Sequence, residues 1–457
     1  MRKGPLWTMA SLLVLSLALL IGASLSLDRQ KERLDWSVTV LEGDPAAAEG
    51  VTLTLRLQDT GGNLLWDSVL TMDPEGFQVD TGFTYCQDPP ERSVTEVQRS
   101  YVHTFSGGGG LYIYDVDEHP DRISKKQAEH PDFPWRAILD VLSRTPEGET
   151  VTETVDLSDY YEAFPVLVTE YPEKDVIYGT APETRLLSPT LWPVPEGTMV
   201  EITIDRDSDL AIMISSETMW PSITSLPWGD GFLVCAQVSD RMSLDAPLSS
   251  DVPLSQGICY LSTQGDGALT LRLPLDLSRV EILETRLGRD DRLQVWLREN
   301  GTLVLLIADP DTGKILQRLD LLSVSEDSYL SVIQEEANCL FTVMGNGDFC
   351  LLERGADGAL SPALKGRPRS TSGDEIRGAV VDALTSYGSN ILWDGERLIW
   401  TAGGDFYPKD IVPLAVYDRT GPLCLAALEC GLFREPTEEE GYYSFQDQDP
   451  ITLSWKE

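Results

Sequence analysis

The sequence predicts an all-β fold assembled from repeated antiparallel sheets, and three observations lead to this prediction. First, sets of β-rich runs joined by short turns recur over residues 223–432. Second, the turns of successive copies keep a nearly constant spacing along the chain. Third, the stretch "LLIADPDTGKILQRLDL" at 305–321 places turn-forming residues between two apolar runs, as a hairpin requires.

Two kinds of turn define the repeat. The first is an Asn-Gly dipeptide, which favours a tight hairpin because both residues tolerate positive φ; it occurs at 300–301 and again 46 residues later at 346–347. The second turn carries a glycine in each copy, with spacings of 46, 45 and 63 residues. These glycines are Gly267, Gly313, Gly358 and Gly421.

A period of about 45 residues with several strands in each copy is typical of a β-propeller, whose blades are four-stranded sheets around an axis. We therefore expect a propeller of about 6–8 blades. The alternative is an ordinary β-sandwich with several hairpins. A sandwich gives no reason for two turn types to stay in register over three copies, so the propeller is preferred.

The second turn resembles the blade motif of quinoprotein-type and YVTN-type propellers, in which Ala-x-Asp-x-x-Thr-Gly joins the outer two strands. Ala308, Asp309, Thr312 and Gly313 match this motif, whereas Gln317 stands where the quinoprotein motif has tryptophan. The resemblance covers blade geometry over roughly residues 223–432. It implies neither a pyrroloquinoline cofactor nor a dehydrogenase activity, and we expect no cofactor.

We expect three parts: a signal anchor or signal peptide (1–30), a mostly β N-terminal domain (31–175) and the propeller (176–457). The N-terminal part contains a hairpin at 51–70 and an amphipathic helix at 134–144, and "YPEKD" at 171–175 reads as a linker. The alternative is that this part supplies one or two further blades. Strands within 441–455 would complete the first blade, a common way for propellers to close.

The N-terminus indicates export. Arg2 and Lys3 precede an uncharged, leucine-rich stretch from Gly4 to Leu27. Its 24 residues exceed the apolar core of an ordinary signal peptide and can span a bilayer. We expect a single-pass membrane protein with an extracytoplasmic domain, or a secreted protein if the segment is cleaved.

The amino-acid composition limits which partners the chain can bind and whether disulfides hold it together. The net charge of −39 repels nucleic-acid phosphates, so no nucleic-acid partner is expected. Seven cysteines in 457 residues are too sparse for a disulfide scaffold, and most lie in apolar runs as small buried hydrophobes. No hairpin register brings Cys339 opposite Cys350 if Asn346-Gly347 is a two-residue turn, so no disulfide joins them.

No metal site or catalytic motif is predicted. The acidic stretch "YDVDEHPD" at 114–121 lacks a standard ligand spacing, and "DRDSD" at 205–209 lacks the glycine and glutamate of a calcium loop. The first reads as a surface loop and the second as a hairpin turn. Catalytic residues are therefore unknown, and paired carboxylates among 74 acidic residues carry no information by themselves.

The long connections indicate where binding takes place. In a four-stranded blade, the segments 239–256, 366–378 and 403–413 all lie on the face opposite the four glycine turns, because they connect the second strand to the third or leave the fourth strand. We expect this face to bind a protein, peptide or glycan. The alternatives are a carboxylate-dependent glycosidase or lyase, and an envelope-complex scaffold. The candidate binding residues are Asp245, Asp251, Arg367, Arg369, Tyr407, Lys409 and Asp410.

Overall fold

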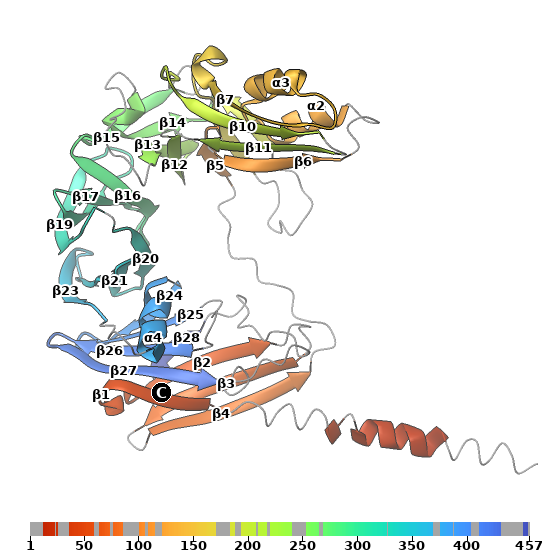
Figure 1. The fold of residues 1–457 in the computed structure, drawn as a ribbon. Helices are drawn as coiled ribbons and strands as arrows, with labels where there is room; N and C mark the ends of the chain where they lie inside the picture. The colour runs from red at the N-terminus through yellow and green to blue at the C-terminus, as the bar shows by residue number, and fades with distance from the viewer. Residues whose placement is uncertain are drawn as a thin grey trace, which may run out of the picture. The chain divides into compact units, whose positions relative to one another are not determined.

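A computed structural model describes the fold (Figure 1). It describes residues 12–22, 24–25, 36–58, 64–73, 76–85, 100–105, 108–114, 121–170, 183–187, 193–206, 209–216, 220–239, 253–264, 268–326, 328–368, 375–386, 388–403, 411–430 and 451–455. The chain forms two compact units. One comprises Met1–Ser93 with Ser328–Glu457, and the other comprises Val94–Asp327.

The second unit contains two four-stranded sheets in which consecutive strands pair antiparallel. The first sheet consists of β12 (Trp220–Trp228), β13 (Gly231–Ser239), β14 (Gly257–Ser262) and β15 (Leu269–Pro274). The second consists of β16 (Val280–Leu287), β17 (Leu293–Glu299), β18 (Thr302–Ala308) and β19 (Ile315–Ser323). Alternating side chains of both sheets, such as Leu233 of β13 and Val295 of β17, are buried in one apolar cluster.

The first unit repeats this topology. One sheet consists of β20 (Leu330–Glu335), β21 (Cys339–Met344), β22 (Phe349–Arg354) and β23 (Leu360–Gly366). The next consists of β24 (Gly388–Trp393), β25 (Arg397–Gly403), β26 (Ile411–Asp418) and β27 (Gly421–Cys430), with β1 (Trp36–Gly43) as a fifth strand beside β27. These are propeller-type blades, which confirms the resemblance expected from the turn motif.

The N-terminal and C-terminal strands share a sheet in the first unit. Strand β28 (Thr452–Trp455) pairs with β2 (Val51–Gln58), which is followed by β3 (Leu64–Asp73) and β4 (Gly76–Tyr85). The short helix η1 (Pro45–Ala48) precedes β2. The hairpin expected at 51–70 is therefore confirmed, and the C-terminal strand completes its sheet. Of the segment 441–455, residues 441–450 lie outside the described part.

The remainder of the second unit is less regular. One sheet has the order β6 (Gly108–Ile113), β11 (Leu210–Ser216), β10 (Met199–Asp205), β7 (Thr150–Asp156). A three-stranded sheet has the order β5 (Ser100–His103), β8 (Val166–Glu170), β9 (Glu183–Leu187). Two helices, α2 (Asp121–Glu129) and α3 (Trp135–Arg144), and the short η2 (Leu157–Asp159) complete this part. Strands β8 and β9 pair although residue 175 lies between them in the sequence, so this sheet crosses the domain boundary expected there. The linker expected at 171–175 lies outside the described residues.

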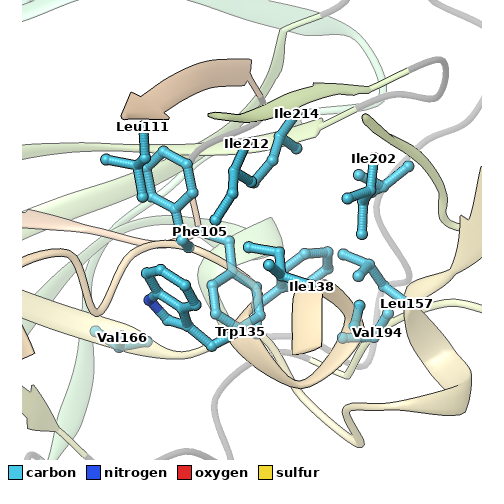
Figure 2. Close-up of a cluster of buried hydrophobic side chains, with 14 of the residues drawn as sticks. Phe105, Leu111, Trp135, Ile138, Leu157, Val166, Val194, Ile202, Ile212 and Ile214 are labelled. Atoms are coloured by element: carbon cyan, nitrogen blue, oxygen red, sulfur yellow. The ribbon is translucent and has the colours of Figure 1, made fainter. Parts of the chain in front are cut away.

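Helix α3 confirms the amphipathic helix expected at 134–144. Its buried face presents Trp135, Ala137, Ile138 and Val141 to the sheet β6-β11-β10-β7. Figure 2 shows Trp135 and Ile138 among Ile202, Ile212 and other apolar side chains of the cluster. The helix therefore covers one face of this sheet.

Helix α4 (Glu375–Ser386) was missed by the sequence analysis, which treated 366–378 as a loop. It lies in the connection between β23 and β24 and buries Val380, Ala383 and Leu384 against the first unit. A second apolar cluster of this unit contains Phe341, Phe349 and Trp400, whose ring centroids are 5.0–5.7 Å apart. The segment 253–256 of the expected loop 239–256 is likewise a short helix, η3 (Pro253–Gln256).

The two Asn-Gly turns differ. Asn300 and Gly301 have φ of 50° and 72° and form the expected two-residue turn, because Glu299 pairs with Thr302. At 346–347 the prediction of a two-residue turn is wrong. Val343 pairs with Phe349 and the Met344 amide donates to Asp348 O, so the turn contains three residues and ends on Gly347 at φ 88°.

Residues 12–22 of the N-terminal segment are helical, and their large apolar side chains are exposed. Among the described residues, no helix has both the length and the apolar character needed to cross a membrane.

Candidate functional site

The connections of a blade fall at two ends of its sheet. Antiparallel pairing puts the turn between the second and third strands at the same end as the exit from the fourth strand. In the sheet β20–β23, Asp348 lies at the end of the first of these connections, directly before β22, and Arg367 lies at the start of the second, directly after β23. Arg367 Nε lies 2.9 Å from Asp348 Oδ1, and Arg367 Nη2 donates to Asp348 Oδ2 at 3.0 Å. This bidentate pair fixes the two connections beside each other, and we call this end of the sheet the long-connection end.

The turn at 345–347 orients the carboxylate of Asp348. The Asp348 amide donates to Asn346 Oδ1 at 3.0 Å, and Asn346 Nδ2 donates to Asp348 Oδ2 at 3.0 Å. The aspartate therefore accepts from both the asparagine and the arginine, each of which comes from a different connection. Half of the Arg367 side chain stays exposed, at 50%. The guanidinium is held in position while much of it still faces solvent.

Tyr329 and helix α4 complete this end. A β-carbon on Gly345 would lie 2.3 Å from the Tyr329 ring, so the ring packs directly on the bare backbone of this glycine. Tyr329 is nevertheless 56% exposed. Ser331 Oγ donates to the carbonyl of Thr385, which ties the end of α4 to β20. The long-connection end therefore presents a tyrosine, an arginine and an aspartate on a fixed framework.

At the opposite end of the sheet β20–β23, and at the corresponding end of the sheet β24–β27, the strands are joined only by short turns. Arg419 Nη2 lies 3.6 Å from Glu353 Oε2, which brings the turn before Gly421 beside the turn that contains Gly358. Asp418 accepts hydrogen bonds from Thr420 Oγ1 at 2.6 Å and from the Thr420 amide at 2.7 Å. Short, self-capped turns at this end contrast with the long connections at the other.

Arg367 alone among the predicted binding residues lies in the described part of the chain, and it lies at the long-connection end. Asp245, Asp251, Arg369, Tyr407, Lys409 and Asp410 lie outside the described residues. The sequence analysis missed Tyr329 and Asp348. Asp348 could have been suggested by its place directly after the Asn-Gly turn, whereas Tyr329 had no comparable signal.

No group of three His, Cys, Asp or Glu side chains in the described ranges could hold a metal ion. Of the acidic stretch 114–121, residues 115–120 lie outside those ranges. The stretch 205–209 joins β10 to β11, as expected for a hairpin turn.

The thiols of Cys235, Cys339 and Cys350 are buried and free, and burial raises the pKa of each to about 12. Such thiols are poor nucleophiles and poor metal ligands.

No protein family model matches the sequence, and no curated protein matches it. Similar solved structures include a protein from Lactobacillus plantarum (12% identity over 90% of this chain and 100% of that chain, TM-score 0.27). They also include a quinoprotein alcohol dehydrogenase-like protein from Bacteroides thetaiotaomicron (10% identity, 93% and 95%, TM-score 0.24). An auxiliary nutrient binding protein from the same organism gives 8% identity, 93% and 95% coverage and a TM-score of 0.24. Similarity at this level carries no argument about what this chain does.

Proposed function

We propose that this chain is an extracytoplasmic binding protein, which recognises a protein, peptide or glycan through the long-connection end of its blade-type sheets. One observation carries the proposal: the Arg367–Asp348 pair and the Ser331–Thr385 contact hold the long connection between β23 and β24 at one end of the sheet β20–β23. Binding residues concentrate on long connections that a rigid framework positions.

The side chains at this end suit recognition. Tyrosine and arginine are enriched where proteins contact their partners, because each combines a large contact area with polar groups of fixed geometry. Tyr329 packs on Gly345, and Arg367 is held by Asp348, so both side chains lose little conformational freedom on binding. The arrangement therefore supports binding rather than a reaction that needs a mobile acid or base.

The N-terminal segment and the charge support a place outside the cytoplasm. Arg2 and Lys3 precede the apolar stretch, and the large side chains of residues 12–22 have no apolar cover among the described residues. A net charge of −39 favours solubility and a neutral or basic partner. We infer that the segment acts as an export signal and stays as a membrane anchor.

Site-specific photocrosslinking tests the binding face. A photoreactive benzoylphenylalanine in place of Tyr329, which is 56% exposed, leaves the Arg367–Asp348 pair intact and should form a covalent adduct with a partner in intact cells. The matched control places the same group at Ala356, an exposed residue in the short turn between β22 and β23. Adducts at position 329 and none at 356 support the proposal. Equal adducts at both positions, or none at 329, would overturn it.

Export has a separate test. Protease added to cells whose outer envelope is permeable should degrade the part of the chain after Leu27, while a cytoplasmic control protein survives. N-terminal mass spectrometry of the membrane fraction then distinguishes an uncleaved anchor from a cleaved signal peptide. Complete protection of the chain from the protease would contradict the proposed location.

A further inference from the structure

The sheet β6-β11-β10-β7 ends on strand β7 at one side, as Figure 1 shows. Strand β7 pairs with β10 along all seven of its residues without a register shift. No described strand pairs with the other side of β7. The structure describes the chain without a gap from residue 121 to residue 170, so the segments that enter and leave β7 are both included. The other side of β7 is therefore a sheet edge.

The direction of each backbone group in β7 follows from two hydrogen bonds at its ends. The Arg206 amide donates to the Glu149 carbonyl at 3.1 Å, and the Leu157 amide donates to the Thr198 carbonyl at 2.9 Å. Both pairs continue the register of β7 with β10, and hydrogen-bonded pairs alternate along an antiparallel ladder. The odd-numbered residues of β7 therefore bond to β10. The residues whose N–H and C=O groups point outward are Thr150, Thr152 and Thr154.

This edge has few of the features that block the addition of a strand. Strand β7 contains no lysine, no proline and no bulge, whereas natural proteins commonly protect an exposed edge with one of these. All three outward threonines are exposed, and no further backbone group of the described residues bonds to them. The edge can therefore accept another strand through its main chain.

Glu153 determines which strand the edge accepts. It lies on the face that helix α3 covers, where Arg144 Nη1 contacts Glu153 and Arg144 Nη2 lies 2.8 Å from Asp140 Oδ2. One guanidinium shared by two carboxylates leaves an excess of negative charge. Because Glu153 bonds to β10, it forms a non-hydrogen-bonded pair with any antiparallel strand on its other side, and side chains lie closest in such pairs. A cation opposite Glu153 is therefore favoured and a carboxylate is disfavoured.

We propose that the β7 edge binds an extended segment of a partner protein as an additional antiparallel strand, with arginine or lysine opposite Glu153 and apolar residues opposite Val151 and Val155. Charge decides the occupant. A second copy of this chain would bring another charge of −39, whereas a basic segment is attracted to the edge. Further exposed carboxylates flank the strand. They belong to Glu147, Glu149 and Asp159.

This edge belongs to the second unit, so the inference does not depend on the function proposed for the long-connection end of the first unit. The two claims have separate tests. A failure of photocrosslinking from Tyr329 leaves the β7 edge untouched, and a failure of strand addition at β7 leaves the long-connection end untouched.

Thr152 allows a variant that blocks the edge and keeps the sheet. Its N–H group points outward, so Thr152→Pro removes no hydrogen bond to β10, and proline is tolerated at such positions of edge strands. Thr152→Val is the matched control, because it keeps the N–H group and loses the same side-chain contact to Thr203 Oγ1. Glu153→Gln removes the selecting charge. Its control is Glu326→Gln, at an exposed acidic residue outside this sheet.

The probes are the peptide acetyl-Thr-Val-Thr-Arg-Thr-Val-Thr-amide and the same peptide with glutamate in place of arginine. Binding to the full chain is followed by calorimetry, and residue-resolved hydrogen exchange follows the amides of β7. We expect the arginine peptide to bind and to slow exchange at Thr152 and Thr154 but not at Val151. The glutamate peptide should bind at least about tenfold more weakly. Thr152→Pro should weaken the arginine peptide by about tenfold and Glu153→Gln by about fivefold, while both controls leave it within about twofold.

Modified peptides test the same contact without changing the protein. N-methylation of the two threonines beside the arginine removes the N–H groups that face β7 and should abolish binding. N-methylation of the two valines alters N–H groups that face away, so that peptide should bind as the unmodified one does.

Four outcomes would overturn the proposal. The first is no binding of the arginine peptide at millimolar concentration. The second is equal binding of the two N-methylated peptides. The third is a Glu326→Gln effect as large as that of Glu153→Gln, which would indicate attraction to the overall charge alone. The fourth is a concentration-dependent dimer of the chain that Thr152→Pro dissociates, which would assign the edge to a second copy. Circular dichroism of each variant checks that it is folded.

Discussion

Gly313 lies so close to Arg272 that a β-carbon on the glycine would be 1.8 Å from the Arg272 carbonyl oxygen. Gly313 ends the turn between β18 and β19, at φ 68°, and Arg272 lies on β15 of the preceding sheet. The same turn is joined to that neighbouring sheet by Trp228 Nε1, which donates to Asp311 Oδ1 at 2.9 Å. The glycine of the blade motif therefore serves the contact between adjacent sheets as well as the turn itself.

Replacing Gly313 should destabilise the second unit far more than replacing an equivalent glycine elsewhere. Gly313→Ala meets the Arg272 backbone and also adopts a left-handed conformation, and we expect a loss of about 3 kcal/mol in the free energy of unfolding. Gly358→Ala is the matched control, because Gly358 has φ 79° but no atom within 4 Å of the added carbon. It should cost about 1 kcal/mol.

Chemical denaturation of the two variants measures both values. The comparison isolates the contact from the conformational cost, since both glycines have a left-handed backbone. Equal losses for Gly313→Ala and Gly358→Ala would show that the approach of Arg272 does not matter to stability.

The first unit should lose stability in acid, because protonation of Asp418 removes a stabilising contribution. The Thr420 hydroxyl, and then the amides of Thr420 and Gly421, donate to its carboxylate and lower its pKa below the ordinary value of 3.8. Because the folded-state pKa is the lower one, the stabilisation is complete above pH 3.8 and is lost as the pH falls through the folded-state pKa.

The variant Asp418→Asn has no proton to gain at this position. We expect it to be less stable than the wild type at about pH 5, with the difference narrowing as the pH falls to about 2.5. Urea unfolding of both proteins across this range measures the difference. A difference that stays constant with pH would contradict the account of this turn.

Five buried thiols should resist alkylation in the folded protein. They are buried, and burial raises the pKa to about 12 for Cys235 and to about 11 for Cys259. Iodoacetamide at about pH 8 should therefore modify them only after denaturant is added. The residues concerned are Cys235, Cys259, Cys339, Cys350 and Cys424.

Intact-mass spectrometry before and after unfolding counts the modified thiols. A Cys339–Cys350 disulfide would contradict the structure, in which Cys339 pairs with Glu353 and Cys350 with Thr342. The prediction that these two cysteines are not bonded is thus confirmed, although the register on which it rested was off by one residue.

That error shows what a dipeptide can and cannot specify. Asn-Gly at 300 and at 346 supplies the same tolerance of positive φ, and the sequence therefore predicted where both turns occur. The second turn also makes contacts with residues outside the hairpin, since Tyr329 packs on Gly345 and Arg367 binds Asp348. No pattern within the hairpin itself encodes those contacts.

The repeat predicted the blade sheets because each strand and turn of β16–β19 and β20–β23 is local in sequence. The pairing of β2 with β28 joins residues about 400 positions apart. It was not predicted, because residues 51–70 were assigned to a separate domain and 441–455 were expected to complete the first blade of the propeller. Helix α4 did carry a signal, because Ile376, Val380 and Leu384 lie at helical spacing, but the polar run before it was taken as the start of a loop.

The candidate site was predicted in position more than in detail. Arg367 was chosen as a polar residue on a long connection, and the structure gives it a fixed place through Asp348. The end of the sheet at which each connection lies was predicted from antiparallel alternation. The pair itself could not be predicted, because it depends on a side-chain contact between two separate connections.

The most direct measurement of the central claim is the effect of removing the long connections. A variant in which residues 240–252 and 404–410 are replaced by Asn-Gly turns is compared with the wild type for thermal unfolding and for photocrosslinking from position 329. A control variant replaces the short turn at 355–358 by another short turn. If the long connections bind the partner, the first variant unfolds within a few degrees of the wild type and forms no adduct, while the control forms it normally. A folded variant that still crosslinks its partner as well as the wild type would contradict the claim.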